Sequence, residues 1–421
     1  MNSTASSFDS SRHRKKVLLS TVGSRGDVQP MLALAMALKQ QGHQPILAAG
    51  PNFSSFVKSH GIDFATYGPD LTERKRWLYE LNNSREKRQK DDAEYIKNAF
   101  ESTYDVAKDC DMIVVGGAFH HAGRSVAQAL DIPFVCALYC AASVSLLNYS
   151  LVWMQLRHQT QKQNRPRSVN IALWKSHEKE QDDRYLDVIN IQRDKLNLAP
   201  IDNVHRHIIS EQPWLVADKT LGPAAKSRNI KINQVGPLLL KNDEPLPSKV
   251  EAFLDNGPPP IYIGFGSMLY TGKLTRKNLI DVCRLSGHRA IISQGWSELD
   301  IPQDDENILA IADINQSKLF PRMAAIVHHG GAGTTTAAAI AGVPQLIVPN
   351  VFDQFYWGHR IEELGIGLAC RNVLTISVDS LVGALQQLMT QQRAQRAMEV
   401  SQNINVHGTE NAALLIEGML S

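Results

Sequence analysis

The sequence VHHGGAGTTTAAAIAGVPQLIVPNVFDQFYWG, residues 327–358, determines how we interpret the whole chain. The apolar run at 325–328 is predicted to be a buried strand, and glycines follow it at 330, 331 and 333. Small residues at 334–341 predict a helix, and 345–349 is a second apolar strand. A strand, a crossover helix and another strand form a parallel pair, so the segment predicts an α/β fold.

The glycine loop has the composition of an anion-binding site. Glycine lets backbone N–H groups approach a ligand closely, and a helix N-terminus carries about half a positive charge. Thr334 can add a hydroxyl donor, and His329 can donate from its ring. The loop lacks the Lys-Ser/Thr ending of a P-loop and the GxGxxG spacing of nicotinamide-binding proteins, which argues against both classes. The alternative is a tight turn that serves packing alone.

An Asp-Gln pair follows the second strand. Side by side, the carboxylate of Asp353 and the amide of Gln354 offer both acceptors and donors to sugar hydroxyls. The alternative is that Asp353 caps the helix predicted at 355–364. Beside an anion-binding loop we favour a site for a sugar joined to a phosphate.

The segment HHGGAGTT…AGVPQLIVPNVFDQFYWGHRIEELGIG resembles the donor-binding signature of UDP-sugar-dependent glycosyltransferases. The branches that it resembles are the glycopeptide-antibiotic glycosyltransferases and the sterol glucosyltransferases. Four more segments resemble this family in the same order: STVGSRGDVQP (20–30), GRSVAQALDIPF (123–134), PPPIYIGFGSM (258–268) and SQGWSELDIP (293–302). The resemblance covers most of the chain, apart from roughly 70–105 and 150–195.

The resemblance implies the GT-B fold, in which two Rossmann-like, doubly wound α/β domains face each other across a cleft. It implies that the nucleotide sugar binds mainly to the second domain and the acceptor to the first. The implied donor-binding residues are Gly266, Ser267 and Trp296 for the nucleotide, His329, Gly331, Gly333 and Thr334 for the diphosphate, and Asp353 and Gln354 for the hexose. It also implies no metal and no cofactor, because the UDP-sugar is a co-substrate.

Asp27 in GSRGDVQP follows the first predicted strand, at 17–22. In the glycopeptide and sterol branches an Asp near this place is the general base, so the resemblance assigns that role to Asp27. Burial would raise the ordinary pKa of about 4, and a helix N-terminus would lower it. The alternative is that Asp27 only caps a helix that starts at Val28.

Two histidines, His120 and His121, follow the strand predicted at 111–117. We consider them as candidates for the acceptor pocket, with ordinary loop histidines as the alternative. The acceptor itself is not specified, because 65–105 and 140–185 resemble the family least. We expect a hydroxylated hydrophobic molecule, such as a sterol, a lipid or a polycyclic or phenolic natural product.

The composition is that of a water-soluble globular chain. The chain has 421 residues, 43% hydrophobic and 20% charged, with a net charge of +2, so nothing points to nucleic acid. No apolar run is long enough to span a membrane, so we expect peripheral membrane contact at most. The cysteines form no CxxC pair, and we expect five free thiols in a cytoplasmic protein.

We predict four parts: an acceptor-binding domain at 1–240, a linker at 241–257, a nucleotide-sugar-binding domain at 258–404, and a C-terminal helix at 405–421 that can pack back on the first domain. The function predicted is an inverting hexosyltransferase, with glucose as the expected sugar. One alternative uses a TDP-deoxysugar on a natural product. Another binds or epimerises a nucleotide sugar without transfer.

Overall fold

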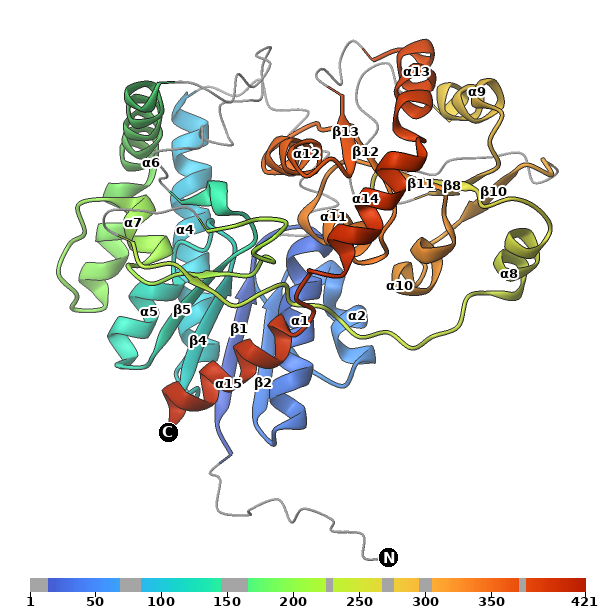
Figure 1. Ribbon diagram of the computed structural model, residues 1–421. Helices are drawn as coiled ribbons and strands as arrows, with labels where there is room; N and C mark the ends of the chain where they lie inside the picture. The colour runs from blue at the N-terminus through green and yellow to red at the C-terminus, as the bar shows by residue number, and fades with distance from the viewer. Residues whose placement is uncertain are drawn as a thin grey trace, which may run out of the picture.

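The computed structural model describes residues 14–68, 85–144, 166–224, 230–266, 276–294, 305–370 and 376–421 (Figure 1). They form two sheets, one in each half of the chain, and every pairing between described strands is parallel. The doubly wound α/β prediction is therefore confirmed.

The first sheet has the strand order β3-β2-β1-β4-β5-β6-β7. Its strands are β1 (Lys16–Thr21), β2 (Gln44–Ala49), β3 (Asp63–Thr66), β4 (Met112–Gly116), β5 (Phe134–Leu138), β6 (Trp214–Leu215) and β7 (Asn233–Gln234). The order reverses between β1 and β4, so β1 and β4 flank the switch point where doubly wound sheets bind ligands.

The second sheet has the order β10-β9-β8-β11-β12-β13, with its own reversal between β8 and β11. Its strands are β8 (Ile261–Gly264), β9 (Ala290–Ser293), β10 (Ile308–Ile311), β11 (Ala325–His328), β12 (Gln345–Ile347) and β13 (Gly367–Ala369). Apolar runs at 261–268, 289–295 and 307–313, together with those at 325–328 and 345–349, predict β8 to β12, and runs at 17–22, 46–49, 111–117 and 133–138 predict β1, β2, β4 and β5. The sequence did not predict β3, β6, β7 or β13. Within their bounds these four strands contain at most two consecutive apolar residues, fewer than the run of about four that is typical of a buried strand.

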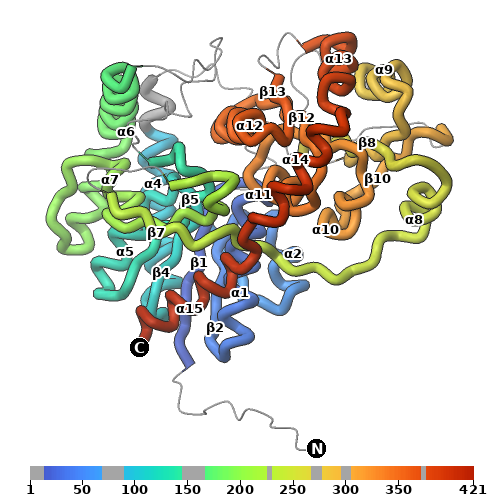
Figure 2. The backbone as a smooth tube through the Cα atoms, viewed as in Figure 1, coloured from blue at the N-terminus to red at the C-terminus, as the bar shows by residue number. Residues whose placement is uncertain are grey.

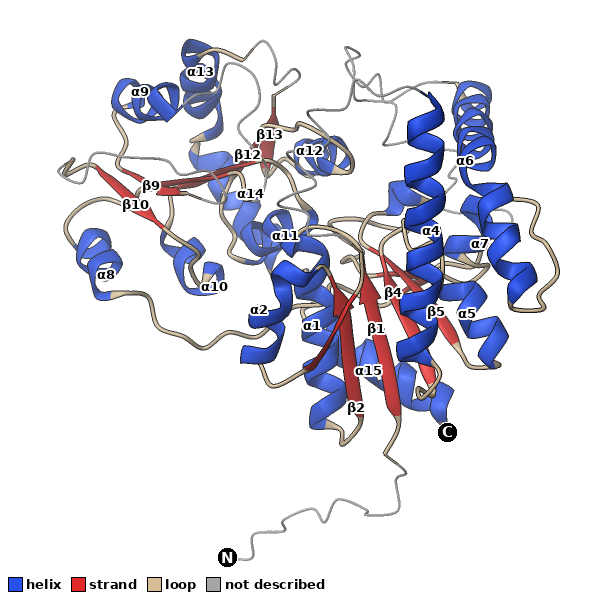
Figure 3. Cartoon of the chain, turned by 180° about the vertical axis from the view of Figure 1, so that it is seen from behind, coloured by secondary structure: helices blue, strands red, loops and turns tan. Residues whose placement is uncertain are grey.

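Helices cover both faces of each sheet (Figures 1 and 3). In the first half they are α1 (Arg25–Gln40), α2 (Ser54–Ser59), α4 (Arg85–Ala107), α5 (Gly123–Leu130), α6 (Arg167–Lys195) and α7 (Val204–Ile209), with short 3₁₀ turns η1 (Pro51–Phe53) and η2 (Ala141–Ser143). In the second half they are α8 (Ser248–Asp255), α9 (Arg276–Ser286), α10 (Gln316–Leu319), η4 (Phe320–Arg322), α11 (Ala332–Ile340), α12 (Gln354–Glu363), α13 (Val378–Leu388) and α14 (Gln391–Ser401).

Successive residues of the central strands point to opposite faces and enter different cores. In β1, Val17 and Leu19 pack with α1, whereas Leu18 packs with α4 and α5. All three side chains are fully buried. Burial on both faces explains why these strands are continuous apolar runs in the sequence.

The chain crosses between the halves twice (Figure 2). It leaves the first sheet after β7 and returns after α14, and a Cβ added at Gly408 would lie 2.3 Å from the Gly236 carbonyl carbon, so the two crossings touch. The last helix, α15 (Gly408–Leu420), then packs on the first sheet beside α1, where Ile416 is fully buried. The limits of the four predicted parts stay a prediction.

Two local expectations need correction. Helix α1 begins at Arg25 rather than at Val28, because Ser24 caps it, and Pro30 therefore lies inside the helix. Proline there removes one backbone donor but leaves the rest of the helix bonded. Residues 248–255, expected in the linker, form α8, and its Val250 and Leu254 pack beneath the second sheet.

Candidate active site

The carboxyl ends of the two sheets face each other. Arg25, at the start of α1, forms an ion pair with Asp313, which follows β10. Farther along, Arg360 of α12 donates from Nε to the Leu221 carbonyl at 2.8 Å and from Nη2 to the Thr220 carbonyl at 3.0 Å. These contacts join the strand ends of one half to those of the other.

The loop after β11 is built around the His329 ring. A Cβ at Gly331 would lie 2.5 Å from His329 Nε2, and one at Gly266 would lie 3.3 Å from its Cε1. At Gly330, φ is +89° and a Cβ would lie 2.6 Å from Ile347. Glycine is therefore required at these positions, because a larger residue would collide with the His329 ring or with Ile347 and because Gly330 has a positive φ. This packing role is separate from the close approach to a ligand that the sequence predicted.

The N-terminus of α11 is open. Gly331 is its N-cap residue and has no side chain that could accept a hydrogen bond from the first-turn N–H groups. A Cβ at Gly333 would meet nothing within 4 Å. Thr334 lies half-buried beside it, in the first turn. This is the arrangement that binds a phosphate at a helix end.

The two histidines of the loop differ in their partners. His328 is fully buried, with Nδ1 accepting from the Gly330 N–H at 3.1 Å and Nε2 3.0 Å from Gln345 Oε1. In contrast, Nδ1 of His329 is buried without a hydrogen-bond partner among the described residues. Burial lowers the pKa of His329 to about 4, against a smaller opposing effect of the Gly264 backbone, so its ring is neutral near pH 7.

Asp353 stands at the N-cap position of α12 but does not cap it. Its Oδ2 instead accepts from the indole Nε1 of Trp357 at 3.0 Å. Burial raises the pKa of Asp353 to about 6, and the Trp357 hydrogen bond opposes this rise. Gln354 is buried, and its Oε1 accepts from the N–H groups of Asn350 at 2.7 Å and Val351 at 3.0 Å. Gln354 therefore holds the turn that presents Asp353.

Asp27 lies in the first turn of α1, where Ser24 and Asp27 form a capping box. Its Oδ2 accepts from the Ser24 N–H at 2.7 Å and from the Ser24 hydroxyl at 3.2 Å. Gly23 gives the carboxylate its space, since a Cβ there would lie 2.0 Å from Oδ2. Burial raises the pKa of Asp27 to about 7 against the Ser24 hydrogen bonds, and the negative charge of Asp353 raises it further. Capping and catalysis are thus compatible roles.

The segment after β5 connects the two carboxylates. The Tyr139 hydroxyl donates to the Asp27 carbonyl at 2.9 Å. The next residue, Cys140, is near enough to Asp353 for the carboxylate to raise the pKa of its thiol, after burial as the main cause. Cys140 and Trp357 also belong to one buried apolar cluster. Asp27 and Asp353, from the two halves of the chain, are thus near enough for the charge of Asp353 to raise the pKa of Asp27.

The histidines after β4 are both buried. His120 accepts from the Gly123 N–H at Nδ1 (3.1 Å), lies 2.7 Å from the Ser20 hydroxyl at Nε2, and stacks on Tyr67. His121 has both ring nitrogens buried without a hydrogen-bond partner among the described residues, and its ring lies 4.6 Å from that of Tyr185. Burial lowers the pKa to about 3 for His120 and about 4 for His121, so both are neutral near pH 7.

Of the other predicted site residues, Gly266 has φ +58° and lies against His329, while Ser267 and Trp296 fall outside the described residues. Sequence reasoning missed Tyr139, Trp357 and Gly23, which position the carboxylates. The sequence offered one signal for these contacts: Trp357 comes four residues after Asp353 in a predicted helix, a spacing that brings two side chains together.

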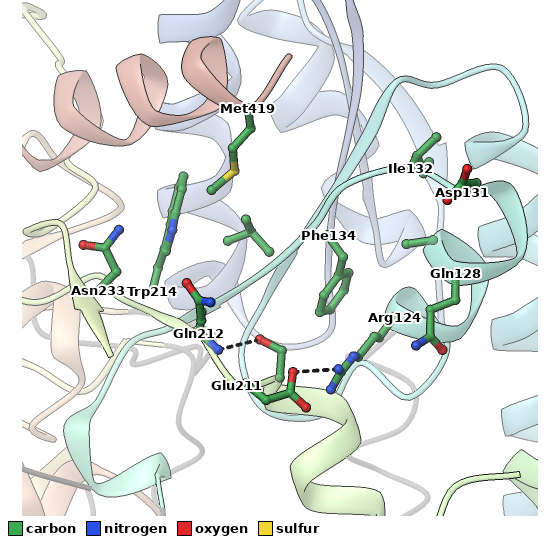
Figure 4. Close-up of a pocket in the computed structure, with 13 residues that line it drawn as sticks. Arg124, Gln128, Asp131, Ile132, Phe134, Glu211, Gln212, Trp214, Asn233 and Met419 are labelled. Carbon is green, nitrogen blue, oxygen red and sulfur yellow. Dashed lines mark hydrogen bonds and ion pairs between the residues drawn. The ribbon is translucent and has the colours of Figure 1, made fainter. Parts of the chain in front are cut away.

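A separate cavity of about 470 Å³ opens in the first half (Figure 4). It lies near the amino ends of β5, β6 and β7, the edge of the sheet opposite to Asp27. Phe134, Trp214 and Met419 line its apolar side, and the ion pair of Arg124 with Glu211 lies on its polar side. The cavity is therefore distinct from the interdomain site.

Known proteins share this sequence and architecture. Residues 17–134 match the glycosyltransferase family 28 N-terminal domain, and residues 291–409 match the erythromycin biosynthesis protein CIII-like C-terminal domain. The vancomycin aglycone glucosyltransferase of Amycolatopsis orientalis is 33% identical over 404 residues, which cover 95% of this chain and 97% of that protein. The chain belongs to this family of GT-B glycosyltransferases.

More distant relatives agree with this assignment. A sterol 3-beta-glucosyltransferase of Arabidopsis thaliana is 29% identical over 92% of this chain and 65% of that protein. The solved calicheamicin glycosyltransferase CalG4 superposes with a TM-score of 0.69 over 97% of this chain and 99% of that one, at 18% identity. The GT-B prediction is therefore confirmed, and this glycosyltransferase is an enzyme. None of its described helices is long and apolar enough to cross a bilayer.

Proposed function

We propose that this glycosyltransferase moves a hexose, with glucose favoured, from UDP to a hydroxyl of an apolar small molecule and inverts the anomeric carbon. One observation carries the proposal: Asp27 of the first half is near enough to Asp353 of the second for its charge to act, and the loop that leads into the open N-terminus of α11 lies against the Gln354 backbone. A base, a sugar-binding carboxylate and an anion site are the three parts that such a transfer needs.

In the proposed donor complex, the diphosphate lies at the N-terminus of α11, with His329, Gly331, Gly333 and Thr334 around it. The helix end stabilises the charge that develops on the leaving UDP, which would make a metal ion unnecessary. Asp353 accepts hydrogen bonds from hexose hydroxyls, and Gln354 holds the turn beneath it.

The transfer is a single displacement. The acceptor oxygen attacks the anomeric carbon, the bond from that carbon to the phosphate oxygen breaks, and its electron pair leaves with UDP. The acceptor proton passes to Asp27. An aspartate with a pKa of about 7 is a stronger base than an ordinary one, and a base is most effective when its pKa is near the working pH.

A TDP-sugar is the second candidate donor. A dTDP-epi-vancosaminyltransferase of Amycolatopsis orientalis is 29% identical over 91% of this chain. Glucose is favoured because the relatives cited above include glucosyltransferases that act on an aglycone and a sterol by name, and UDP is the nucleotide that the sequence resemblance implies.

The test is a screen of UDP- and TDP-sugars against sterols, polyphenols and macrocycles, read by product mass. We expect a hexose mass added from UDP-glucose. If product forms only with TDP-sugars, the donor is a TDP-sugar and not a UDP-sugar. If the nucleotide sugar is hydrolysed or epimerised and the acceptor is not modified, the protein does not catalyse the proposed transfer. The anomeric proton coupling of the product, measured by NMR, reports the stereochemistry: an α-glycoside from an α-linked donor excludes a single displacement.

A further inference from the structure

Helix α12 begins just after Asp353 and lies on the side of the second half that faces the first (Figures 1 and 3). Trp357 and Arg360 are three residues apart on this helix, so their side chains share one of its faces. Both are buried, and both contact the segment 220–222 of the first half. The helix that follows the proposed sugar-binding carboxylate is therefore held from the other half of the chain.

The contact of Gly222 with Trp357 leaves no room for a side chain. A Cβ at Gly222 would lie 2.8 Å from Cη2 and 3.0 Å from Cζ3 of the indole, and the next nearest atom is the Ala217 Cβ at 3.4 Å. The φ of Gly222 is not in the left-handed region, so its backbone would accept another residue. Glycine is therefore needed here because the indole packs directly on the backbone.

The segment that carries Gly222 is fixed within the first half. Asp218 is buried, and its Oδ1 accepts from the N–H groups of Thr220 at 2.7 Å and Leu221 at 3.0 Å. The Gln234 amide donates from Nε2 to the Gly222 carbonyl at 3.0 Å. These hydrogen bonds make the segment a rigid surface against which the indole packs.

The five-membered ring of the same indole holds Asp353. Its Nε1 donates to Oδ2 of the carboxylate at 3.0 Å, and the Trp357 backbone N–H donates to the Asp353 carbonyl, also at 3.0 Å. Because an indole is a rigid plane, any displacement of its six-membered ring at Gly222 also displaces the N–H group. The orientation of the Asp353 carboxylate therefore depends on a contact with the first half.

We propose that Trp357 is a positioning residue for the donor sugar: it holds the Asp353 carboxylate in the orientation that binds the hexose, and its own position is set by Gly222 of the other half. This inference rests on the proposed role of Asp353 in hexose binding. The proposed UDP contacts lie elsewhere in the second half, at His329 and the N-terminus of α11. Recognition of the hexose therefore depends on the contact between the halves, whereas recognition of UDP does not.

The first test uses the ligand-free enzyme, so that it does not depend on any transfer activity. The chain has six tryptophans, and the 15N–1H signal of the Trp357 indole is the one lost in Trp357→Phe. We expect this signal to move in Asp353→Asn, which removes the charged acceptor, and in Gly222→Ala, whose methyl displaces the ring. An unmoved signal in Gly222→Ala would overturn the dependence on the first half.

Gly418→Ala is the matched control for this test. Gly418 lies in α15, which packs on the first sheet, and a Cβ there would meet nothing within 4 Å. The added methyl should therefore leave the Trp357 signal in place. If this variant moves the signal as far as Gly222→Ala does, the shift is not specific to the contact at Gly222, and the inference is wrong.

The second test compares the affinities for UDP and UDP-glucose by calorimetry. Trp357→Phe keeps a ring against Gly222 and removes the N–H group, so it remains informative if Gly222→Ala folds poorly. We expect it to weaken UDP-glucose binding about tenfold, the effect of one hydrogen bond to a charged group, and to leave UDP affinity unchanged. Equal weakening of both ligands would mean that Trp357 serves only the packing of the second half.

Trp214→Phe is the matched control for the binding test. Trp214 and Trp357 are both 1% exposed, but Trp214 lines the separate cavity at the opposite edge of the first sheet. The same substitution there should leave both affinities unchanged. If it also weakens UDP-glucose binding selectively, the loss does not come from the contact with Asp353, and the positioning role is rejected.

The two proposals fail in different ways. If the variants move the Trp357 signal and weaken UDP-glucose binding selectively, but the native enzyme transfers no sugar, the proposed function fails alone. If the native enzyme transfers glucose and neither Trp357→Phe nor Gly222→Ala changes the ratio of the UDP-glucose and UDP affinities, the positioning role fails alone.

Discussion

The loop after β4 and the loop after β11 occupy equivalent places, since each follows the strand beside the first strand of its sheet. Two consecutive histidines occur at each place: His120 and His121 lie in the loop after β4, and His328 ends β11 while His329 begins the loop after it. In both, the first histidine accepts a hydrogen bond at Nδ1 from a glycine N–H 3.1 Å away: Gly123 to His120, and Gly330 to His328.

The second histidines have different surroundings. His121 lies against the rings of Tyr95 and Tyr185, from the helices α4 and α6. His329 lies between two glycines beside the open end of α11. The second histidine of the pair is therefore packed against aromatic rings in the first half, whereas in the second half it lies at a candidate anion-binding site. What differs is where the glycines lie relative to the second histidine.

The largest expected effect is the loss of activity on removal of the proposed base, Asp27, with donor binding in the second half unchanged. Asp27→Asn keeps the size of the side chain and an acceptor for Ser24 but cannot take a proton. We expect kcat to fall by about a hundredfold to ten-thousandfold, the usual contribution of a positioned base. UDP affinity, measured by calorimetry, should be unchanged, because the proposed UDP contacts lie in the second half. Full activity in this variant would leave Asp27 with capping alone.

A pair of glycines tests the packing of the two loops. Gly330 and Gly117 have similar φ values of +89° and +84°, but only at Gly330 would a Cβ clash, at 2.6 Å from Ile347. Gly330→Ala should cost about 3 kcal/mol through strain and overpacking, and Gly117→Ala about 1 kcal/mol through strain alone. Denaturant unfolding measures both. Equal losses would show that the contact with Ile347 relaxes freely.

The pH dependence of stability tests the environment of Asp27. The unfolded chain releases this proton near the ordinary pKa of 3.8, whereas the folded chain holds it up to about 7. Between these values the folded state binds more protons, so stability falls as pH rises. Asp27→Asn removes this loss and should be more stable than the native protein at pH 8 by about 1–2 kcal/mol, after allowance for the partial exposure of Asp27. Melting curves at pH 4 should show no such gain; a gain that is independent of pH would contradict the raised pKa.

The sequence predicted the fold class and most strands because apolar runs, helical spacing and glycine turns are local signals. It also predicted site roles for Asp27, Asp353 and the glycine loop, whose residue types suit that chemistry, and these roles stay predictions. It could not show that Gly23 makes room for the Asp27 carboxylate or that Gly331 makes room for His329, because such requirements depend on side chains brought together by the fold. The partnership of Asp27 with Asp353, distant in sequence, was equally invisible.

His329 and His120 give different expectations for UDP affinity. His329→Ala removes a donor from the proposed diphosphate site, so UDP affinity should fall about tenfold, the loss of one charge-assisted hydrogen bond. The melting temperature should fall as well, because the loop packs around this buried ring, so UDP affinity is the measurement that distinguishes the two variants. His120→Ala should lower the melting temperature and leave UDP affinity unchanged, because it removes the contacts to Ser20 and Gly123. Calorimetric titration with UDP would detect the reverse pattern and reject the assignment.

The smallest expected effect is that of Gly333→Ala, because the added methyl group would contact no neighbouring atom. It lies within α11 at an ordinary φ, and a Cβ there meets nothing within 4 Å, as is also true of Gly383 in α13. Alanine is a better helix former, so each Gly→Ala change should raise stability by up to about 1 kcal/mol. Their effects on UDP should differ: Gly333→Ala places a methyl where the diphosphate is proposed to lie and should weaken binding severalfold, whereas Gly383→Ala should not. If both variants gain stability and both bind UDP as the native protein does, the space beside Gly333 holds no ligand, and the diphosphate must bind elsewhere than at the N-terminus of α11.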